Sequence, residues 1–88
     1  MKIVLFAFVL NIQMAEVTDL YPPMAFETTA ECSQMLEEVL PSVHYWRQPG
    51  YFDAGALCEP MKMEDIPMVR TSIYKQLREI VNPFGRRR

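Results

Sequence analysis

The longest unbroken apolar stretch of the chain is Ile3-Val4-Leu5-Phe6-Ala7-Phe8-Val9-Leu10. Its eight residues are far fewer than the roughly 20 that a membrane-spanning helix needs. Most of them are β-branched or aromatic, and a continuous apolar run of this length is typical of a strand that is covered on both faces. We therefore predict a buried strand at the N-terminus.

A secretory signal is the alternative interpretation of the same segment. Lys2 precedes the apolar run, and residues 11–15 could hold a cleavage site after Ala15. Gln13 stands where such a site needs a small residue, so we favour the strand. The choice bears on the compartment, since a strand favours a cytoplasmic or virion-associated location over secretion.

The size and composition of the chain set the class of protein. It has 88 residues and 10.3 kDa, with 50% hydrophobic and 23% charged residues. This composition is typical of a globular chain and excludes a disordered one, and the length excludes dinucleotide-binding and barrel enzymes. We expect a single domain over residues 1–82, followed by a basic tail over residues 83–88.

The next elements are predicted from alternation and capping. Residues 12–20 have the pattern of a half-exposed strand that forms a hairpin with the first, and Tyr21-Pro22-Pro23 should end it because proline cannot donate to a sheet. Thr28 and Glu31 then form a capping box. Apolar residues follow at helical spacing, so we predict an amphipathic helix over residues 29–40 that ends at Pro41.

The second half of the chain predicts further strands and a second helix. Pro49-Gly50 suits the centre of a type II turn, with strands expected over residues 43–47 and 51–58. Apolar residues repeat at helical spacing from Pro67 to Asn82-Pro83, where the helix should end. The predicted fold class is a small α+β domain: an N-terminal β-hairpin packed on an amphipathic helix, further strands and a C-terminal amphipathic helix.

The charge is unevenly distributed along the chain. Residues 1–69 hold three basic and ten acidic side chains, a net charge of −7, whereas residues 70–88 hold six basic and one acidic, a net charge of +5. Such asymmetry is found in segments that contact nucleic acid or acidic partners, and also in solvated tails that keep a chain soluble. The candidate basic contacts are Arg70, Lys75, Arg78, Arg86, Arg87 and Arg88.

The two cysteines, Cys32 and Cys58, are candidates for a disulfide between a helix and a strand. Two buried thiols are the alternative, and the redox compartment decides between them. These cysteines and His44 have no spacing typical of a metal site, and nothing in the sequence places His44 beside Cys32 as a catalytic pair. We expect no enzymatic activity, no metal and no cofactor.

An aromatic segment is the strongest candidate for a binding surface. Aromatic and arginine side chains are enriched at the energetic centres of protein interfaces, although in a small domain they can equally fill the core. The candidate partner-binding residues are His44, Tyr45, Trp46, Arg47, Tyr51 and Phe52. We expect a non-enzymatic protein-binding or assembly module, with nucleic-acid binding or a secreted disulfide-stabilised domain as alternatives. A second copy of the chain is a further candidate partner, in a homo-oligomer.

The order of elements also carries a resemblance. Phe26, Thr28 and Cys32 open the predicted helix, and Cys58 and Pro60 close a strand. Over residues 1–61 this arrangement resembles small uncharacterised two-cysteine proteins of tailed phages and proteobacteria. The resemblance implies a small ββαβ-type domain and favours a phage or phage-derived reading frame as its source, and it implies no activity or functional residue.

Overall fold

β1 (Lys2–Asn11) is the central strand of a three-stranded antiparallel sheet. The computed structural model describes residues 1–86, and in it β2 (Glu16–Phe26) and β3 (Phe52–Met61) pair with the two sides of β1. The predicted N-terminal strand is confirmed. Removal of residues 1–15 would take away the strand on which both others depend.

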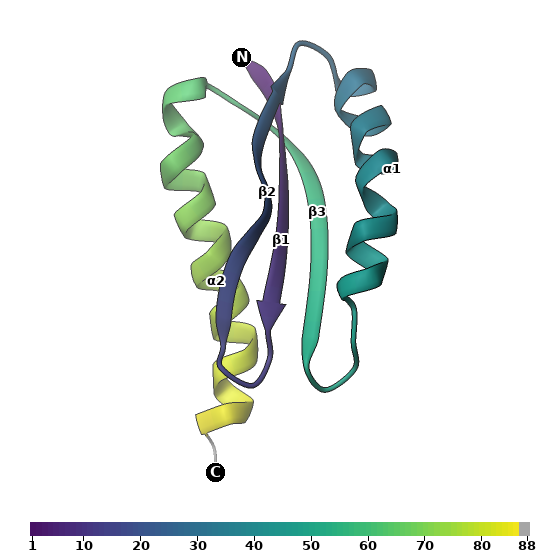
Figure 1. Cartoon of the computed structure of the whole chain (residues 1–88). Coiled ribbons are helices and arrows are strands. Elements are labelled where there is room, and N and C mark those ends of the chain that lie inside the picture. The colour runs from purple at the N-terminus through teal and green to yellow at the C-terminus, as the bar shows by residue number, and fades with distance from the viewer. Residues whose placement is uncertain (87–88) are drawn as a thin grey trace.

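Two helices cover the two faces of this sheet (Figure 1). α1 (Thr29–Trp46) lies on one face, and α2 (Ile66–Arg86) lies on the other after a short 3₁₀ helix, Met63–Asp65. Val4 and Phe6 pack toward α2, whereas Leu5 and Val9 pack toward α1. Alternate residues of β1 thus enter different halves of the core, which explains its uninterrupted apolar sequence. The predicted α+β class is confirmed.

α1 begins as predicted and ends later than predicted. Thr28 and Glu31 form the complete capping box, in which the Glu31 N–H donates to Thr28 Oγ1 at 3.1 Å. The expected end at Pro41 is wrong, because the helix continues through this proline to Trp46. Proline removes one backbone bond, but Val43 is buried against the sheet and Trp46 extends the same apolar face. Residues 43–47 are therefore not a strand.

β2 differs from its prediction at both ends. Residues 12–15 form the turn of the hairpin, so the strand begins at Glu16. It continues through Pro22 and Pro23 to Phe26, and the register with β1 shifts at this point. An edge strand accepts proline at such an irregularity because no ladder donor is needed there.

The predicted turn at Pro49-Gly50 is confirmed, but α1 and not a strand precedes it. The Tyr51 N–H donates to the Gln48 carbonyl at 2.9 Å, with Pro49 and Gly50 at the centre of the turn. Gly50 has a φ of 85°, which a type II turn requires at this position. β3 follows directly and extends to Met61, past the expected end at Cys58.

α2 packs on the sheet through Ile66, Val69 and Ile73. The expected end of this helix at Asn82-Pro83 is wrong, because its backbone is helical to Arg86. Arg87 and Arg88 lie outside the described residues.

Gly55 of β3 lies opposite Phe8, whose ring covers it. A Cβ atom at position 55 would lie 2.8 Å from Phe8 Cζ, which is too close. We expect Gly55→Ala to lower the free energy of unfolding by about 1 kcal/mol, since overpacking outweighs the gain from replacing a flexible glycine. Urea unfolding measures the loss, and in a Phe8→Leu background the same substitution should cost nothing. An equal cost in both backgrounds would contradict this explanation.

Candidate protein-binding groove beside Trp46

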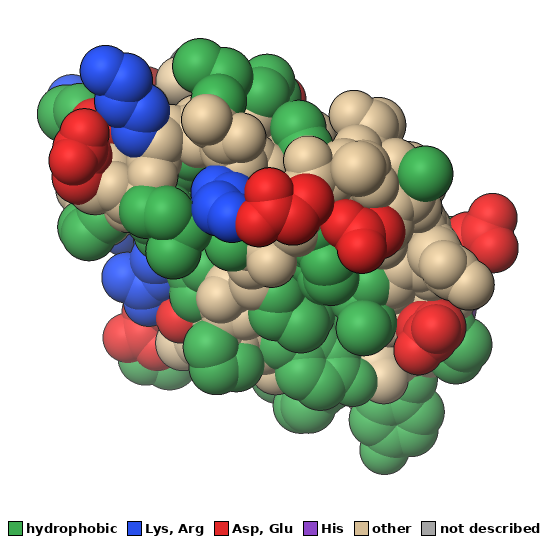
Figure 2. Space-filling model, turned by 90° about the horizontal axis from the view of Figure 1, so that it is seen from above, with side chains coloured by type: hydrophobic (Ala, Val, Ile, Leu, Met, Phe, Trp, Pro, Cys, Tyr) green, Lys and Arg blue, Asp and Glu red, His purple; other side chains and the backbone are tan. Residues whose placement is uncertain are grey.

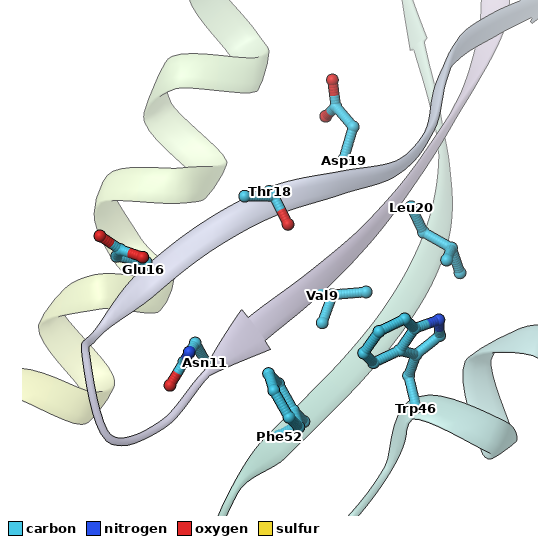
Figure 3. Close-up of a pocket in the computed structure, with 8 residues that line it drawn as sticks. All are labelled: Val9, Asn11, Glu16, Thr18, Asp19, Leu20, Trp46 and Phe52. Carbon is cyan, nitrogen blue, oxygen red and sulfur yellow. The ribbon is translucent and has the colours of Figure 1, made fainter.

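A groove lies on the α1 face of the sheet, where β2 begins. α1 packs mainly over β1 and β3, so this end of β2 is left uncovered on that face. The groove has a volume of about 370 Å³. Figure 3 shows the residues that line it: Val9, Asn11, Glu16, Thr18, Asp19, Leu20, Trp46 and Phe52.

The inner part of the groove is apolar and firmly packed. The rings of Trp46 and Phe52 meet edge to face, with centroids 5.4 Å apart and planes at 79°. Val9 is buried beneath them, and Leu20 is half-buried beside them. Because both rings are held in this cluster, the groove offers a preformed apolar surface.

The outer part of the groove is polar. Asn11, Glu16 and Thr18 lie along this side, near the hairpin turn (Figure 3). Glu16 is exposed and makes no ion pair with the side chains described over residues 1–80. The groove thus combines an apolar interior with the exposed carboxylate of Glu16 at its edge.

Of the predicted aromatic segment, the structure brings only Trp46 and Phe52 into the groove. Tyr45 is 73% exposed and contacts Trp46 edge to face, with the ring centroids 5.9 Å apart. Tyr51 is 58% exposed in the turn. His44 is exposed near the end of α1. Trp46 and Phe52 therefore serve the core and the groove together, while Tyr45 and Tyr51 remain available on the surface.

Arg47 has a structural partner. Its Nε donates to the Ala54 carbonyl at 2.9 Å and lies 3.5 Å from Asp53 Oδ1. It also lines a second, shallower hollow of about 250 Å³ on the other side of Phe52. Arg47 therefore covers an outward-facing carbonyl of the edge strand β3 and does not enter the Trp46 groove.

The β1 and β2 residues of the groove are not among the residues predicted from the sequence. Glu16, Thr18 and Leu20 alternate along β2 and so lie on one face of it. This alternation was a usable signal, but Trp46 is distant in sequence, and only the fold places it opposite them.

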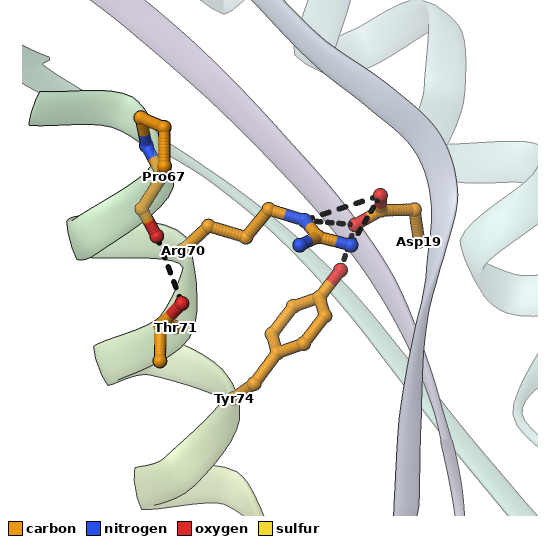
Figure 4. A network of polar contacts seen from close by, with 5 residues as sticks. All are labelled: Asp19, Pro67, Arg70, Thr71 and Tyr74. Atoms are coloured by element: carbon orange, nitrogen blue, oxygen red, sulfur yellow. Dashed lines mark hydrogen bonds and ion pairs between the residues drawn. The ribbon is translucent and has the colours of Figure 1, made fainter. Parts of the chain in front are cut away.

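Among the side chains described over residues 66–80, the basic residues of α2 do not form one free surface. Arg70 makes a bidentate contact with Asp19, with Nη2 at 2.8 Å from Oδ2, and Tyr74 donates its hydroxyl to the same carboxylate (Figure 4). The hydrogen bond to Asp19 raises the pKa of Arg70, while partial burial opposes this effect. Lys75 is exposed and Arg78 is half-buried. The Arg86 side chain, Arg87 and Arg88 lie outside the described part of the structure.

Charges of opposite sign also meet at the end of the molecule where the N-terminus lies. Lys2 donates to Glu27, and this hydrogen bond and the attraction of the ammonium group lower the pKa of Glu27 below its usual value. Figure 2 shows acidic and basic side chains next to one another over this end. The basic side chains at this end lie beside acidic ones, so they form no continuous basic surface for a polyanion in this view.

Cys32 and Cys58 form a disulfide that joins the first turn of α1 to β3. Their Cα atoms are 6.3 Å apart, and Cys32 is fully buried. The disulfide pairing considered from the sequence is therefore the arrangement in this structure.

Among the described residues, no group of three or more metal-binding side chains is present.

The described helices include none with the length and apolar character needed to span a membrane. Comparisons of the chain with protein-family models, with curated proteins and with solved structures found no match.

Proposed function

We propose that this protein is a small non-enzymatic protein-binding module that holds an apolar side chain of its partner in the Trp46 groove. The observation that carries the proposal is the open groove of about 370 Å³ with Trp46 and Phe52 fixed in its interior. Aromatic side chains in preformed pockets dominate the energetics of many interfaces. Tyr45 adds exposed aromatic area beside Trp46.

The charge around the groove favours a basic partner. Glu16 lies at its edge and makes no ion pair with the side chains described over residues 1–80, and residues 1–69 carry a net charge of −7. We expect the bound segment to combine an aliphatic or aromatic anchor with a neighbouring lysine or arginine, since complementary charges steer association and fix register.

Nucleic-acid binding through the C-terminal helix has less support. Arg70 is already neutralised by Asp19, so this guanidinium is not available to a phosphate. Fewer free cations mean fewer phosphate contacts and weaker binding. A secreted or otherwise oxidised location is compatible with the binding module, because the disulfide of this structure would persist there.

Selection from a random peptide library, followed by titration of Trp46 fluorescence, tests the proposal. Trp46 is the only tryptophan, so its emission reports directly on the groove. We expect selected peptides to shift this emission and to bind at least about tenfold more weakly to Tyr45→Ala and to the groove-filling variant Thr18→Phe.

Met68→Ala is the matched control, because Met68 is a large exposed apolar residue on α2, on the opposite side of the sheet. It should bind the selected peptides as tightly as the unmodified protein. The proposal fails if no peptide changes the Trp46 emission, or if Met68→Ala weakens binding as much as Tyr45→Ala and Thr18→Phe do.

A further inference from the structure

The outer edge of β2 beside the groove is the feature that extends the proposal. β2 is an edge strand, and a strand at the edge of a sheet presents backbone groups that can pair with another chain. Pro22 and Pro23 protect its second half, since neither can donate. No proline lies in its first part, residues 16–21, which adjoin the groove.

The pairing of β1 establishes which backbone groups face outward. Ile12 donates its N–H to the Tyr51 carbonyl at 3.0 Å, so residue 12 directs its backbone groups toward β3. Along an antiparallel strand, the backbone N–H and C=O groups of successive residues point alternately to one side and to the other. Even-numbered residues of β1 therefore face β3 with their backbone groups, and odd-numbered residues face β2.

The register between β1 and β2 shows which residues of β2 direct their backbone groups toward β1 and which direct them outward. Thr18 lies opposite Val9 and belongs to a hydrogen-bonded pair, whereas Val17 lies opposite Leu10 and points its backbone groups away from the sheet. Asp19 lies opposite Phe8, and its backbone groups also point away from the sheet. Within the described residues, no backbone hydrogen bond outside the sheet engages either residue.

We infer that an extended basic peptide of a partner protein adds a fourth strand to the sheet at Val17 and Asp19 and places an apolar side chain in the Trp46 groove. The inference rests on the proposed function and names the binding mode. A residue opposite Thr18 in an added strand points to the same face as Thr18, which is the face of the groove. Main-chain bonds provide affinity in this mode, and the groove with Glu16 provides selectivity.

Amide hydrogen exchange gives the direct test. In the free protein the Val17 and Asp19 amides should exchange quickly, and the Thr18 amide slowly. The probe is a short peptide in which leucine and threonine alternate and a lysine stands at each end. On saturation with this peptide we expect protection of both outward amides and a shift of the Trp46 emission.

A second peptide separates backbone pairing from groove binding. It has the same side chains, but its backbone is N-methylated at alternate residues so that it cannot pair with an edge strand. We expect it to bind at least about tenfold more weakly. Val17→Pro should weaken the unmodified peptide similarly, whereas Val17→Ala, the matched variant that keeps the N–H, should not.

The outcomes distinguish the two proposals. A shifted Trp46 emission with unprotected Val17 and Asp19 amides, or equal binding of the N-methylated peptide, overturns strand addition and leaves the groove as the binding site. An absence of both responses overturns strand addition and counts equally against the groove. Concentration-dependent protection of Val17 and Asp19 without any peptide would identify a second copy as the occupant, and would also overturn the inference.

Discussion

Reduction of the Cys32–Cys58 disulfide is expected to lower the free energy of unfolding by about 3.5 kcal/mol. The bridged residues are 26 positions apart, so the cross-link removes much of the conformational freedom of the unfolded chain. A domain of this size has a total stability of only about 4–13 kcal/mol. The unfolding temperature should therefore fall by about 15–25 °C.

Thermal and urea unfolding with and without reductant measure this effect. Intact mass establishes the state of the cysteines in each sample, since the oxidised chain lacks the two thiol hydrogens. The double variant Cys32→Ala/Cys58→Ala is the control, and reductant should leave its stability unchanged. Equal stability of the oxidised and reduced proteins, with both thiols shown to be free after reduction, would contradict the expected contribution.

Sequence reasoning succeeded where the signal was local. The capping box requires only Thr28 and Glu31 three positions apart, and the structure contains both of its hydrogen bonds. The Pro49-Gly50 turn likewise depends on the conformational preferences of two adjacent residues. The N-terminal strand could be predicted because covering both faces of a strand demands continuous apolar sequence.

It failed where packing outweighed a local rule. Pro41 does not end α1, because Val43 and Trp46 gain burial by extending the helix over the sheet. Pro22 and Pro23 do not end β2, since the register shift leaves no ladder bond for them to break. Both errors treat proline as an absolute barrier, whereas its cost is a few kcal/mol that other interactions can offset.

The candidate site was predictable only in its aromatic half. Trp46 and Phe52 were selected by residue type, and the structure places both in the groove. Thr18 and Leu20 complete it from β2. Their proximity to Trp46 follows from the strand order and from the position of α1 nearer to β3 than to β2. Neither feature can be predicted from local patterns in one sequence.

Leu5→Ala should be the most destabilising simple truncation in the core, at about 3–5 kcal/mol. Leu5 is fully buried in the central strand and packs with Cys32 and Val39. A deletion at this position leaves a cavity enclosed by a sheet and a helix that are also tied together by the disulfide, so the surroundings cannot easily collapse. Urea unfolding of the oxidised protein measures the cost, and a loss below about 1 kcal/mol would contradict it.

The position of Leu5 also predicts coupling to the disulfide. Leu5 pairs directly with Cys58 across the two strands, so the cross-link and this side chain share one environment. In a cycle that combines the milder Leu5→Val with reduction, we expect the effects to depart from additivity by at least about 0.5 kcal/mol. Val4→Ala is the matched control, since Val4 is equally buried but packs on the α2 face. Its effect should be the same in both redox states, because the sheet separates it from the disulfide, and equal coupling at Val4 and Leu5 would show that the two halves of the core respond as one.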